Sequence, residues 1–226
     1  MFKNSENSTS QSKDINGANE DVPQLSTETF AALQEFYREQ EQRESECKRL
    51  RNNLNNDFEE NWQLSQFWYS DSTVNDLVVI AKKSLLPGNK IALISCPTLY
   101  KSMKNKLSAS CEVHLYEYDT RFSVYGVDFV KYDYRYPLNI PQSYRSYYDL
   151  VIADPPFLSE ECLTKTAETI KYISRDKIIL CTGAVMFPLA KQLLSLNKAK
   201  FKPSHKNNLA NEFYCYSNYN IDSLLV

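Results

Sequence analysis

The tetrapeptide of Asp154, Pro155, Pro156 and Phe157 is the sharpest chemical signal in this 226-residue sequence. Each proline lacks a backbone N–H, fixes its own φ and confines the preceding residue to an extended conformation. The turn is therefore stiff, and it offers the Asp154 carboxylate and nearby carbonyls as acceptors beside an aromatic ring. Such a site suits an amino group, held by its N–H bonds so that its nitrogen lone pair points at an electrophile. The alternative is a rigid connector between a strand and a helix.

Polar residues also follow the other predicted strands. They are Ser95, Cys96 and Pro97 after the first strand, Glu117, Tyr118 and Asp119 at the end of the second, and Asp133 after the third. In a parallel sheet the ligand crevice lies beyond the carboxyl ends of the strands. We therefore expect these residues to meet Asp154 at one edge of the sheet.

The elements that must position these residues are short apolar segments that alternate with helical patterns. Strands are predicted over 90–95, 112–118, 128–132, 148–153, 177–182, 200–205 and 212–218, and helices over 98–107, 159–173 and 185–196, with a further helix from a cap at Thr73 to about residue 85. Nearly continuous apolar strands are typical of a parallel sheet that is buried on both faces. The sequence therefore predicts a doubly wound α/β domain over residues 61–226.

The segment before this domain has a different composition. Residues 1–24 are rich in Ser, Asn and other polar residues, which predicts a disordered tail. Residues 25–60 carry a thin apolar stripe among many charges and are predicted to form one long helix. This helix is either a solvated element or a partner-binding one.

Composition excludes several classes of protein. The four glycines are too far apart for a dinucleotide-binding or P-loop motif, and the six cysteines show no metal-ligand spacing. We therefore expect no metal. No apolar run reaches the roughly 18 residues that span a bilayer, so no membrane association is expected. The balance of 26 Lys and Arg against 28 Asp and Glu gives no indication of a nucleic-acid partner.

The strand followed by Asp-Pro-Pro-Phe resembles a motif of S-adenosylmethionine-dependent amino-methyltransferases. The longer stretches 62–70, 117–126, 152–162, 180–183 and 208–213 resemble one branch, the eukaryotic elongation factor 1-alpha lysine methyltransferase 1 family, and the likeness covers about residues 33–219. It implies a Rossmann-like, seven-strand class I methyltransferase fold whose last strand inserts antiparallel. It also implies S-adenosyl-L-methionine as cofactor and a lysine of translation elongation factor 1-alpha as substrate, in the cytoplasm. We expect a monomer.

Position and resemblance together predict individual roles. Asp154 is expected to orient the substrate amine, and Glu117, or failing it Asp119, to accept hydrogen bonds from the ribose hydroxyls. Asp133 is expected to contact the adenine amino group, and Tyr69 to fold over the cofactor or the lysine channel. Ordinary core packing is an equal alternative for the aromatic residues. The loop after the first strand lacks the glycines of most such enzymes, which leaves its contacts with the cofactor open.

The motif itself does not choose the substrate. An adenine amino group has no ammonium proton to lose, so N6-adenine methylation of nucleic acid is one alternative. A cofactor-binding interaction protein without catalytic activity is another.

Overall fold

A computed structural model describes residues 34–38, 58–156, 159–207 and 212–226. The chain divides into two units, residues 1–58 and residues 59–226. In the first unit, residues 34–38 are helical, and Arg38 forms an ion pair with Glu35 at 3.5 Å. The predicted tail and most of the predicted helix over 25–60 lie outside the described residues, so the proposed boundaries of that region stay a prediction.

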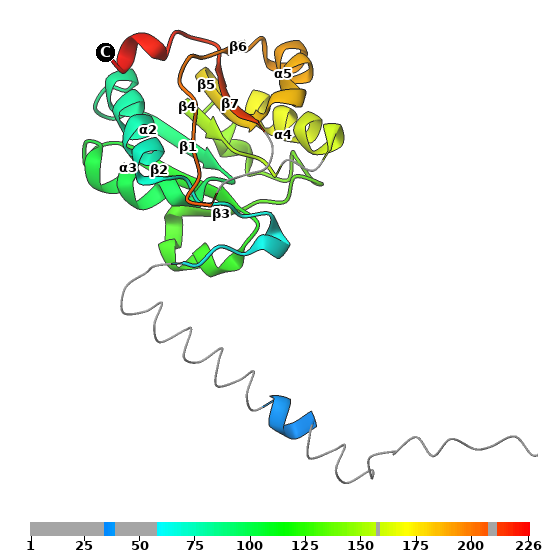
Figure 1. Ribbon diagram of the computed structural model, residues 1–226. Coiled ribbons are helices and arrows are strands. Elements are labelled where there is room, and N and C mark those ends of the chain that lie inside the picture. Colours follow the sequence, from blue (N-terminus) through cyan, green and yellow to red (C-terminus); the bar gives the residue numbers. More distant parts are fainter. Residues whose placement is uncertain (1–33, 39–57, 157–158, 208–211) are drawn as a thin grey trace, which may run out of the picture. The chain divides into compact units, whose positions relative to one another are not determined.

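Residues 59–226 form one seven-stranded sheet in the order β3-β2-β1-β4-β5-β7-β6 (Figure 1). The strands are β1 (Lys90–Ile94), β2 (Glu112–Glu117), β3 (Phe129–Lys131), β4 (Tyr148–Ala153), β5 (Ser174–Gly183), β6 (Asn197–Lys198) and β7 (Phe213–Ser217). The first five run parallel, and β7 pairs antiparallel with both β5 and β6. The predicted mostly parallel sheet with an inserted antiparallel last strand is confirmed.

Helices cover both faces of the sheet. Helices α2 (Asp71–Ser84) and α3 (Tyr100–Lys106) lie on one face, and α4 (Glu160–Ile173) and α5 (Phe187–Leu194) lie on the other (Figure 1). Short 3-10 turns are η1 (Trp62–Leu64), η2 (Pro97–Leu99), η3 (Thr120–Asp128), η4 (Gln142–Tyr144), η5 (Ala184–Met186) and η6 (Asp222–Leu224).

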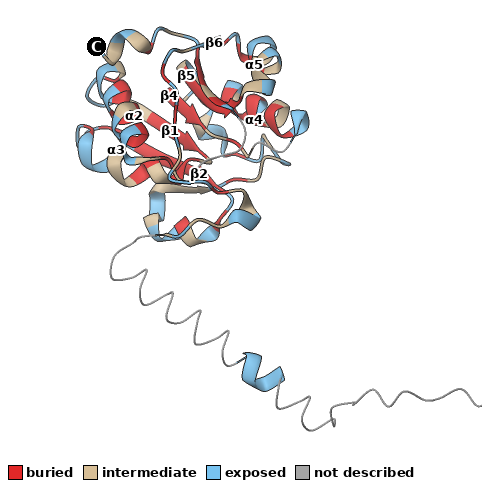
Figure 2. Cartoon of the chain, in the orientation of Figure 1, coloured by how far each residue is buried: buried red, intermediate tan, exposed pale blue. Residues whose placement is uncertain are grey.

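The strands are hydrophobic on both faces because both faces are covered. Ile94 and Tyr116 belong to the core cluster that includes residues of α4 and α5, while their neighbours Leu93 and Leu115 are equally buried. Figure 2 shows this buried layer running along the strands and the inner sides of the helices.

The first helix begins three residues earlier than predicted. Ser70, not Thr73, is its N-cap, and the Ser70 hydroxyl oxygen accepts a hydrogen bond from the Thr73 backbone N–H at 3.3 Å. The Thr73 hydroxyl oxygen instead accepts from the backbone N–H of Ser204 at 2.8 Å. The cap prediction was wrong because Thr73 is a buried contact to a distant loop.

The strand predicted over 200–205 is also absent from the described structure. The backbone N–H groups of Lys200 and Phe201 donate to the Asp222 carboxylate, and Pro203 has no N–H to offer a ladder. The chain from Ser204 onward pairs with the segment before α2 instead: Ser70 N–H donates to Ser204 C=O at 2.9 Å, and Tyr69 and His205 form an antiparallel bridge. This pairing helps to build the site described next.

Candidate functional site

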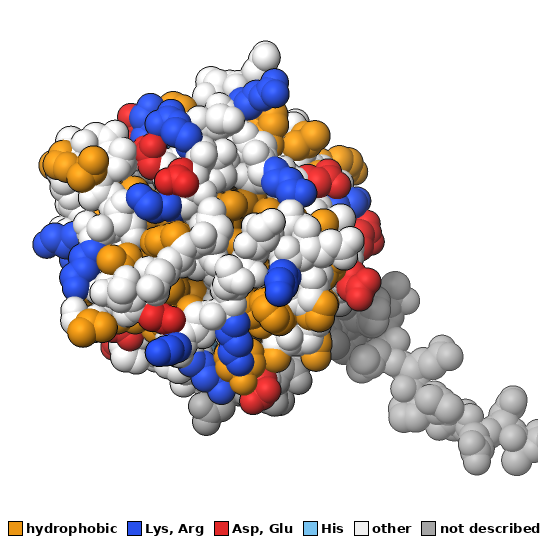
Figure 3. All heavy atoms as spheres, turned by 90° about the horizontal axis from the view of Figure 1, so that it is seen from above, with side chains coloured by type: hydrophobic (Ala, Val, Ile, Leu, Met, Phe, Trp, Pro, Cys, Tyr) orange, Lys and Arg blue, Asp and Glu red, His pale blue; other side chains and the backbone are white. Residues whose placement is uncertain are grey.

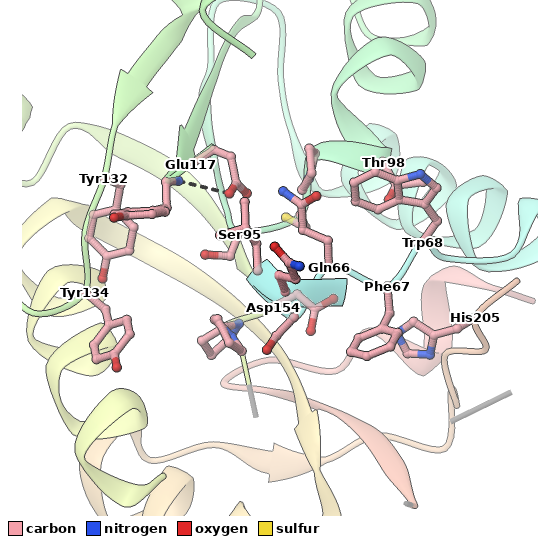
Figure 4. A pocket seen from close by; sticks show the side chains of 18 of the residues that line it. Gln66, Phe67, Trp68, Ser95, Thr98, Glu117, Tyr132, Tyr134, Asp154 and His205 are labelled. Atoms are coloured by element: carbon pink, nitrogen blue, oxygen red, sulfur yellow. Dashed lines mark hydrogen bonds between the residues drawn. The ribbon is translucent and has the colours of Figure 1, made fainter. Parts of the chain in front are cut away.

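A cavity of about 610 Å³ lies at the carboxyl ends of the central strands (Figure 4). Residues after β1, β2, β3 and β4 line it, as do Gly183 at the end of β5 and Phe213 at the start of the antiparallel β7. Residues 63–68 line it as well, from the segment that precedes α2; we call residues 59–70 the strap. The cavity therefore combines the edge of the sheet with a segment from the beginning of the domain.

The cavity has two ends and a centre. Glu117, Tyr132 and Tyr134 lie toward one end, and Asp154 lies near the centre. A second set, Phe67, Trp68 and His205, lies toward the opposite end (Figure 4). The strand order explains this division, because β2 and β3 lie on one side of the central pair β1 and β4, whereas β5 and β7 lie on the other.

Asp154 comes directly after β4, and its backbone N–H donates to the Ile94 carbonyl at 2.9 Å. Burial raises the pKa of its carboxyl group to about 8, against a lowering effect of the nearby Tyr69 hydroxyl, and the charge of Glu117 raises it further. The group is therefore mostly protonated at pH 7 in the free protein. Pro155 and Pro156 also line the cavity, whereas Phe157 lies outside the described residues.

The glycine-free loop after β1 adopts a conformation that favours glycine. Ser95 has φ of 54°, in the left-handed region, and its N–H donates to the Tyr116 carbonyl at 2.9 Å. Cys96 is buried, and burial raises the pKa of its thiol well above the usual value, so the thiol stays protonated. Pro97 begins η2. All three residues line the cavity, as predicted.

Glu117 and Tyr118 line the cavity, and Glu117 is buried at the end of β2. One carboxylate oxygen of Glu117, Oε1, accepts from the backbone N–H groups of Tyr118 at 3.0 Å and Asp119 at 3.2 Å. Burial raises the pKa of this carboxyl group to about 7, although these two hydrogen bonds lower it. A ligand that donates hydrogen bonds to Glu117 stabilises the charged form of the carboxyl group. It therefore offsets part of the free energy that burial of this charge requires.

Asp119, the alternative to Glu117, does not line the cavity. Its carboxylate accepts from the Arg121 Nε at 2.8 Å and from the Gln66 amide nitrogen at 3.1 Å. Burial acts to raise the pKa of Asp119, but the hydrogen bonds from Arg121 outweigh it and the pKa is lowered. Asp119 therefore joins the strap to the region after β2, and Glu117 is the carboxylate that faces a ligand.

Asp133 lines the cavity, but Arg135 occupies its carboxylate. The Arg135 guanidinium donates to both carboxylate oxygens, with Nη2 2.6 Å from Oδ2 and Nε 3.0 Å from Oδ1. These hydrogen bonds lower the pKa of Asp133. The predicted contact of Asp133 with an adenine amino group must compete with this ion pair, and it stays a prediction.

Among the aromatic residues of the strap, Phe67 and Trp68 line the cavity and Tyr69 does not. Tyr69 is fully buried, and its bridge to His205 holds the two rings 5.1 Å apart, so direct contact with a cofactor is not what the structure shows. Its hydroxyl lies close enough to Asp154 to lower the pKa of that carboxyl group. Tyr69 therefore packs beneath the residues that line the cavity and does not line the cavity itself.

The strap is held by two of its side chains, Glu60 near its start and Gln66 further along. The Glu60 carboxylate accepts from Trp62 Nε1 at 2.9 Å, from Trp68 N–H at 2.6 Å and from the Asn207 side-chain amide at 2.6 Å. Further along, Gln66 bonds to Asp119. These contacts fix the strap to the loop before β7 and to the region after β2.

Our sequence reasoning missed several residues of the cavity, among them Gln66, Gly183, His205 and Phe213. Gly183 could have been predicted to line the cavity, because it directly follows the predicted strand 177–182 and the ligand crevice lies beyond the carboxyl ends of the strands. His205 was not, since it fell at the end of a strand that does not form. Among the described residues, no group of three or more His, Cys, Asp or Glu side chains is placed to hold a metal ion, and no helix there has the length and hydrophobicity to cross a membrane.

The matching family model and the curated relatives of this chain are all named as methyltransferases. Residues 60–221 match the family described as "Probable N6-adenine methyltransferase". EEF1A lysine methyltransferase 1 of Gallus gallus is 50% identical over 209 residues, which cover 88% of this chain and 95% of that protein. The Homo sapiens protein of the same name is 47% identical over 201 residues, covering 88% of this chain and 94% of that protein. Among solved structures, a SAM-dependent methyltransferase from Aquifex aeolicus is 9% identical and covers 70% of this chain and 91% of that one, with a TM-score of 0.45.

Proposed function

The chain belongs to the EEF1A lysine methyltransferase 1 family, and from this premise we propose that it transfers methyl groups from S-adenosyl-L-methionine to a lysine of translation elongation factor 1-alpha. The observation that carries the proposal is the place of Asp154 at the centre of one cavity, between an end suited to a nucleoside and an aromatic end. A translation factor as substrate makes the cytoplasm the proposed location, with the protein acting as a monomer.

The residues of the first end fit the proposed cofactor. Glu117 is a buried carboxyl group that faces the cavity. Hydrogen bonds from a partner with two hydroxyl groups, such as a ribose, stabilise its ionised form against the effect of burial. The left-handed Ser95 brings the backbone of the loop to the cavity wall in place of glycine. When bound, S-adenosylmethionine supplies a methyl group on a positively charged sulfur.

Asp154 is the residue that orients the amine. A cation that enters the cavity stabilises the carboxylate, so it lowers the raised pKa of Asp154 and favours the ionised form at pH 7. The ionised carboxylate then accepts hydrogen bonds from the amine and holds its lone pair in line with the methyl carbon. Pro155 and Pro156 keep this acceptor in place, since their φ angles are fixed.

The aromatic end suits the aliphatic stem and the cationic tip of a lysine. Phe67, Trp68 and Phe213 line it, and aromatic faces attract ammonium groups by about 0.5–2 kcal/mol each. Apolar walls also disfavour the charged ammonium, which helps the amine to lose its proton.

Adenine methylation is the weaker candidate. The net charge of −2 offers little attraction to phosphates. On the face seen in Figure 3, Lys and Arg side chains lie among acidic and hydrophobic ones and do not gather into a basic track across its described residues.

Labelled S-adenosylmethionine tests the proposal directly. The protein is incubated with purified elongation factor 1-alpha and, separately, with DNA and with RNA. Label on a lysine of the elongation factor alone is the expected result, and label in nucleic acid would overturn the assignment. The Asp154→Ala variant should lose transfer but keep cofactor binding, whereas Asp176→Ala, at an exposed aspartate, should behave like wild type.

A further inference from the structure

Methylation of a lysine requires a proton acceptor, and the carboxyl groups of the cavity do not suit this role. An ordinary lysine, with pKa about 10.4, lies about 3.4 units above pH 7, so deprotonation costs about 4.6 kcal/mol there. Asp154 is mostly protonated at pH 7 in the free protein, and the cation that ionises it becomes the partner of its carboxylate. A fully charged carboxylate would also stabilise the ammonium and oppose the loss of its proton.

His205 lies at the aromatic end of the same cavity, on the opposite side from Glu117 (Figure 4). Its ring packs against two neighbours: the Tyr69 ring at 5.1 Å and the Phe213 ring at 4.9 Å in an edge-on arrangement. The antiparallel backbone bridge to Tyr69 holds the His205 backbone beside the strap. Tyr69 also lies close to Asp154, so one buried side chain borders both the imidazole and the residue that orients the amine.

The imidazole is in the right protonation state to accept a proton. Burial lowers its pKa below the usual 6.5, although the charge of Glu60, the acidic group that acts on it from the strap, raises it. In the described part of the chain, no protein group hydrogen-bonds to its ring nitrogens. The residue is only partly buried, so a proton taken up by the ring has a route to water.

We propose that His205 is the catalytic base that takes the proton from the substrate lysine, an inference that rests on the function proposed above. The Nζ–H bond of the ammonium breaks, its electron pair stays on nitrogen, and the proton binds an imidazole nitrogen before it leaves to solvent. The lone pair then attacks the methyl carbon, the S–C bond breaks, and its electron pair returns to sulfur.

The aromatic end makes this proton transfer possible. Phe67, Trp68 and Phe213 remove water from the ammonium, and the sulfonium repels it, so both lower the pKa of the lysine toward that of the imidazole. A neutral acceptor adds no charge that would hold the ammonium in place. His205 and Asp154 thus divide two tasks, proton removal and orientation.

Single-turnover rates of His205→Asn test the proposal. Loss of a general base should slow methyl transfer on the order of 100-fold at pH 7, with affinity for S-adenosylhomocysteine kept within about twofold. The deficit should shrink roughly tenfold for each pH unit above 7, because the amine then loses its proton to solvent. His114→Asn, which changes the other histidine, should keep the wild-type pH profile. A deficit that is equal at every pH, or no deficit, would overturn the base assignment.

A binding measurement decides the inference independently of the substrate. The chain has two histidines, so their imidazole NMR signals separate readily and are assigned with the same two variants. In the presence of S-adenosylhomocysteine, n-butylamine should shift the His205 signal saturably and leave that of His114 unchanged. A His205 signal that does not respond overturns the role of His205, even if elongation factor is labelled. Absence of label on elongation factor, with a His205 response, instead overturns the substrate assignment alone.

Discussion

Asp154 and Glu117 are two carboxyl groups of one cavity whose pKa values are both raised, to about 8 and about 7, chiefly by burial. Each group lowers the stability of the free protein when it ionises, and each gains a partner when a ligand enters. The two ionised carboxylates therefore lower the stability of the free protein, and ligand binding offsets this loss.

Replacing Asp154 by Asn should stabilise the free protein at high pH and not at low pH. The pKa of Asp154 is 3.8 in a model compound and about 8 in the folded protein, so between these values the folded state binds more protons than the unfolded one. Stability must then fall as pH rises through this window. Asn does not ionise, so we expect it to add ~1–3 kcal/mol at pH 9 and little at pH 4. Urea unfolding at the two pH values measures this.

The control for that experiment is Asp176→Asn, at an exposed position on β5, which should change stability little at either pH. Equal stabilisation by Asp154→Asn at pH 4 and pH 9 would contradict the raised pKa.

Glu117→Gln should remove the pH dependence of nucleoside binding. The ionised carboxylate accepts hydrogen bonds from the ribose, so wild-type affinity should fall roughly tenfold from pH 8 to pH 6, as a group of pKa about 7 takes up its proton. S-adenosylhomocysteine is the suitable probe, because its sulfur is uncharged and does not act on Asp154. Calorimetry of the Gln variant should give weaker binding at pH 8 that varies little with pH. Glu168→Gln, at an exposed position of α4, should behave as wild type.

In the loop after β1, Ser95 adopts the left-handed backbone conformation that glycine usually provides. A left-handed conformation costs an L-residue about 1–2 kcal/mol, and a β-branched residue more. Ser95 meets this cost where the backbone must turn from β1 into η2 beside the cavity, and Ser195 meets the same cost at the end of α5, away from the cavity. The two serines have nearly the same φ, but only Ser95 lines the cavity, so substitutions at Ser195 serve as controls for those at Ser95.

Val at either position should destabilise the protein by a further amount of about 1 kcal/mol or more in urea unfolding, because a β-branched residue adopts φ near 55° less readily than serine. Gly should be neutral or slightly stabilising, because relief of the backbone strain opposes the higher entropy of the unfolded chain. The Ser95→Val variant alone should also weaken binding of S-adenosylhomocysteine. Unchanged binding in Ser95→Val would show that this loop does not contact the cofactor.

Residues 59–226 contain the whole described sheet and all of the described residues that line the cavity. We expect this part of the chain by itself to bind S-adenosylhomocysteine with an affinity within about twofold of the full chain. Calorimetry on both forms checks this, with circular dichroism to verify folding. A folded 59–226 chain that binds tenfold more weakly or worse would contradict the expectation. Comparing their rates on elongation factor then measures what residues 1–58 contribute.

The alternation of strands and helices and the place of the site were predictable because both depend on local patterns, whereas the antiparallel last strand was expected only from the family resemblance. Apolar strands alternate with helices, and the carboxyl ends of parallel strands meet at one edge, so Ser95, Glu117 and Asp154 were found to share a cavity as expected. The roles of Tyr69 and His205 were not predictable in this way. They depend on a backbone bridge between residues 136 positions apart (205 minus 69), which no short pattern records.

The same bridge determines when the site becomes complete during synthesis. The strap is synthesised before its partners Ser204, His205 and Asn207, which follow β5 and α5 in the sequence. A nascent chain can thus assemble its five parallel strands while the cavity still lacks one wall. The wall of the cavity that carries His205 is consequently among the last of its parts to be synthesised.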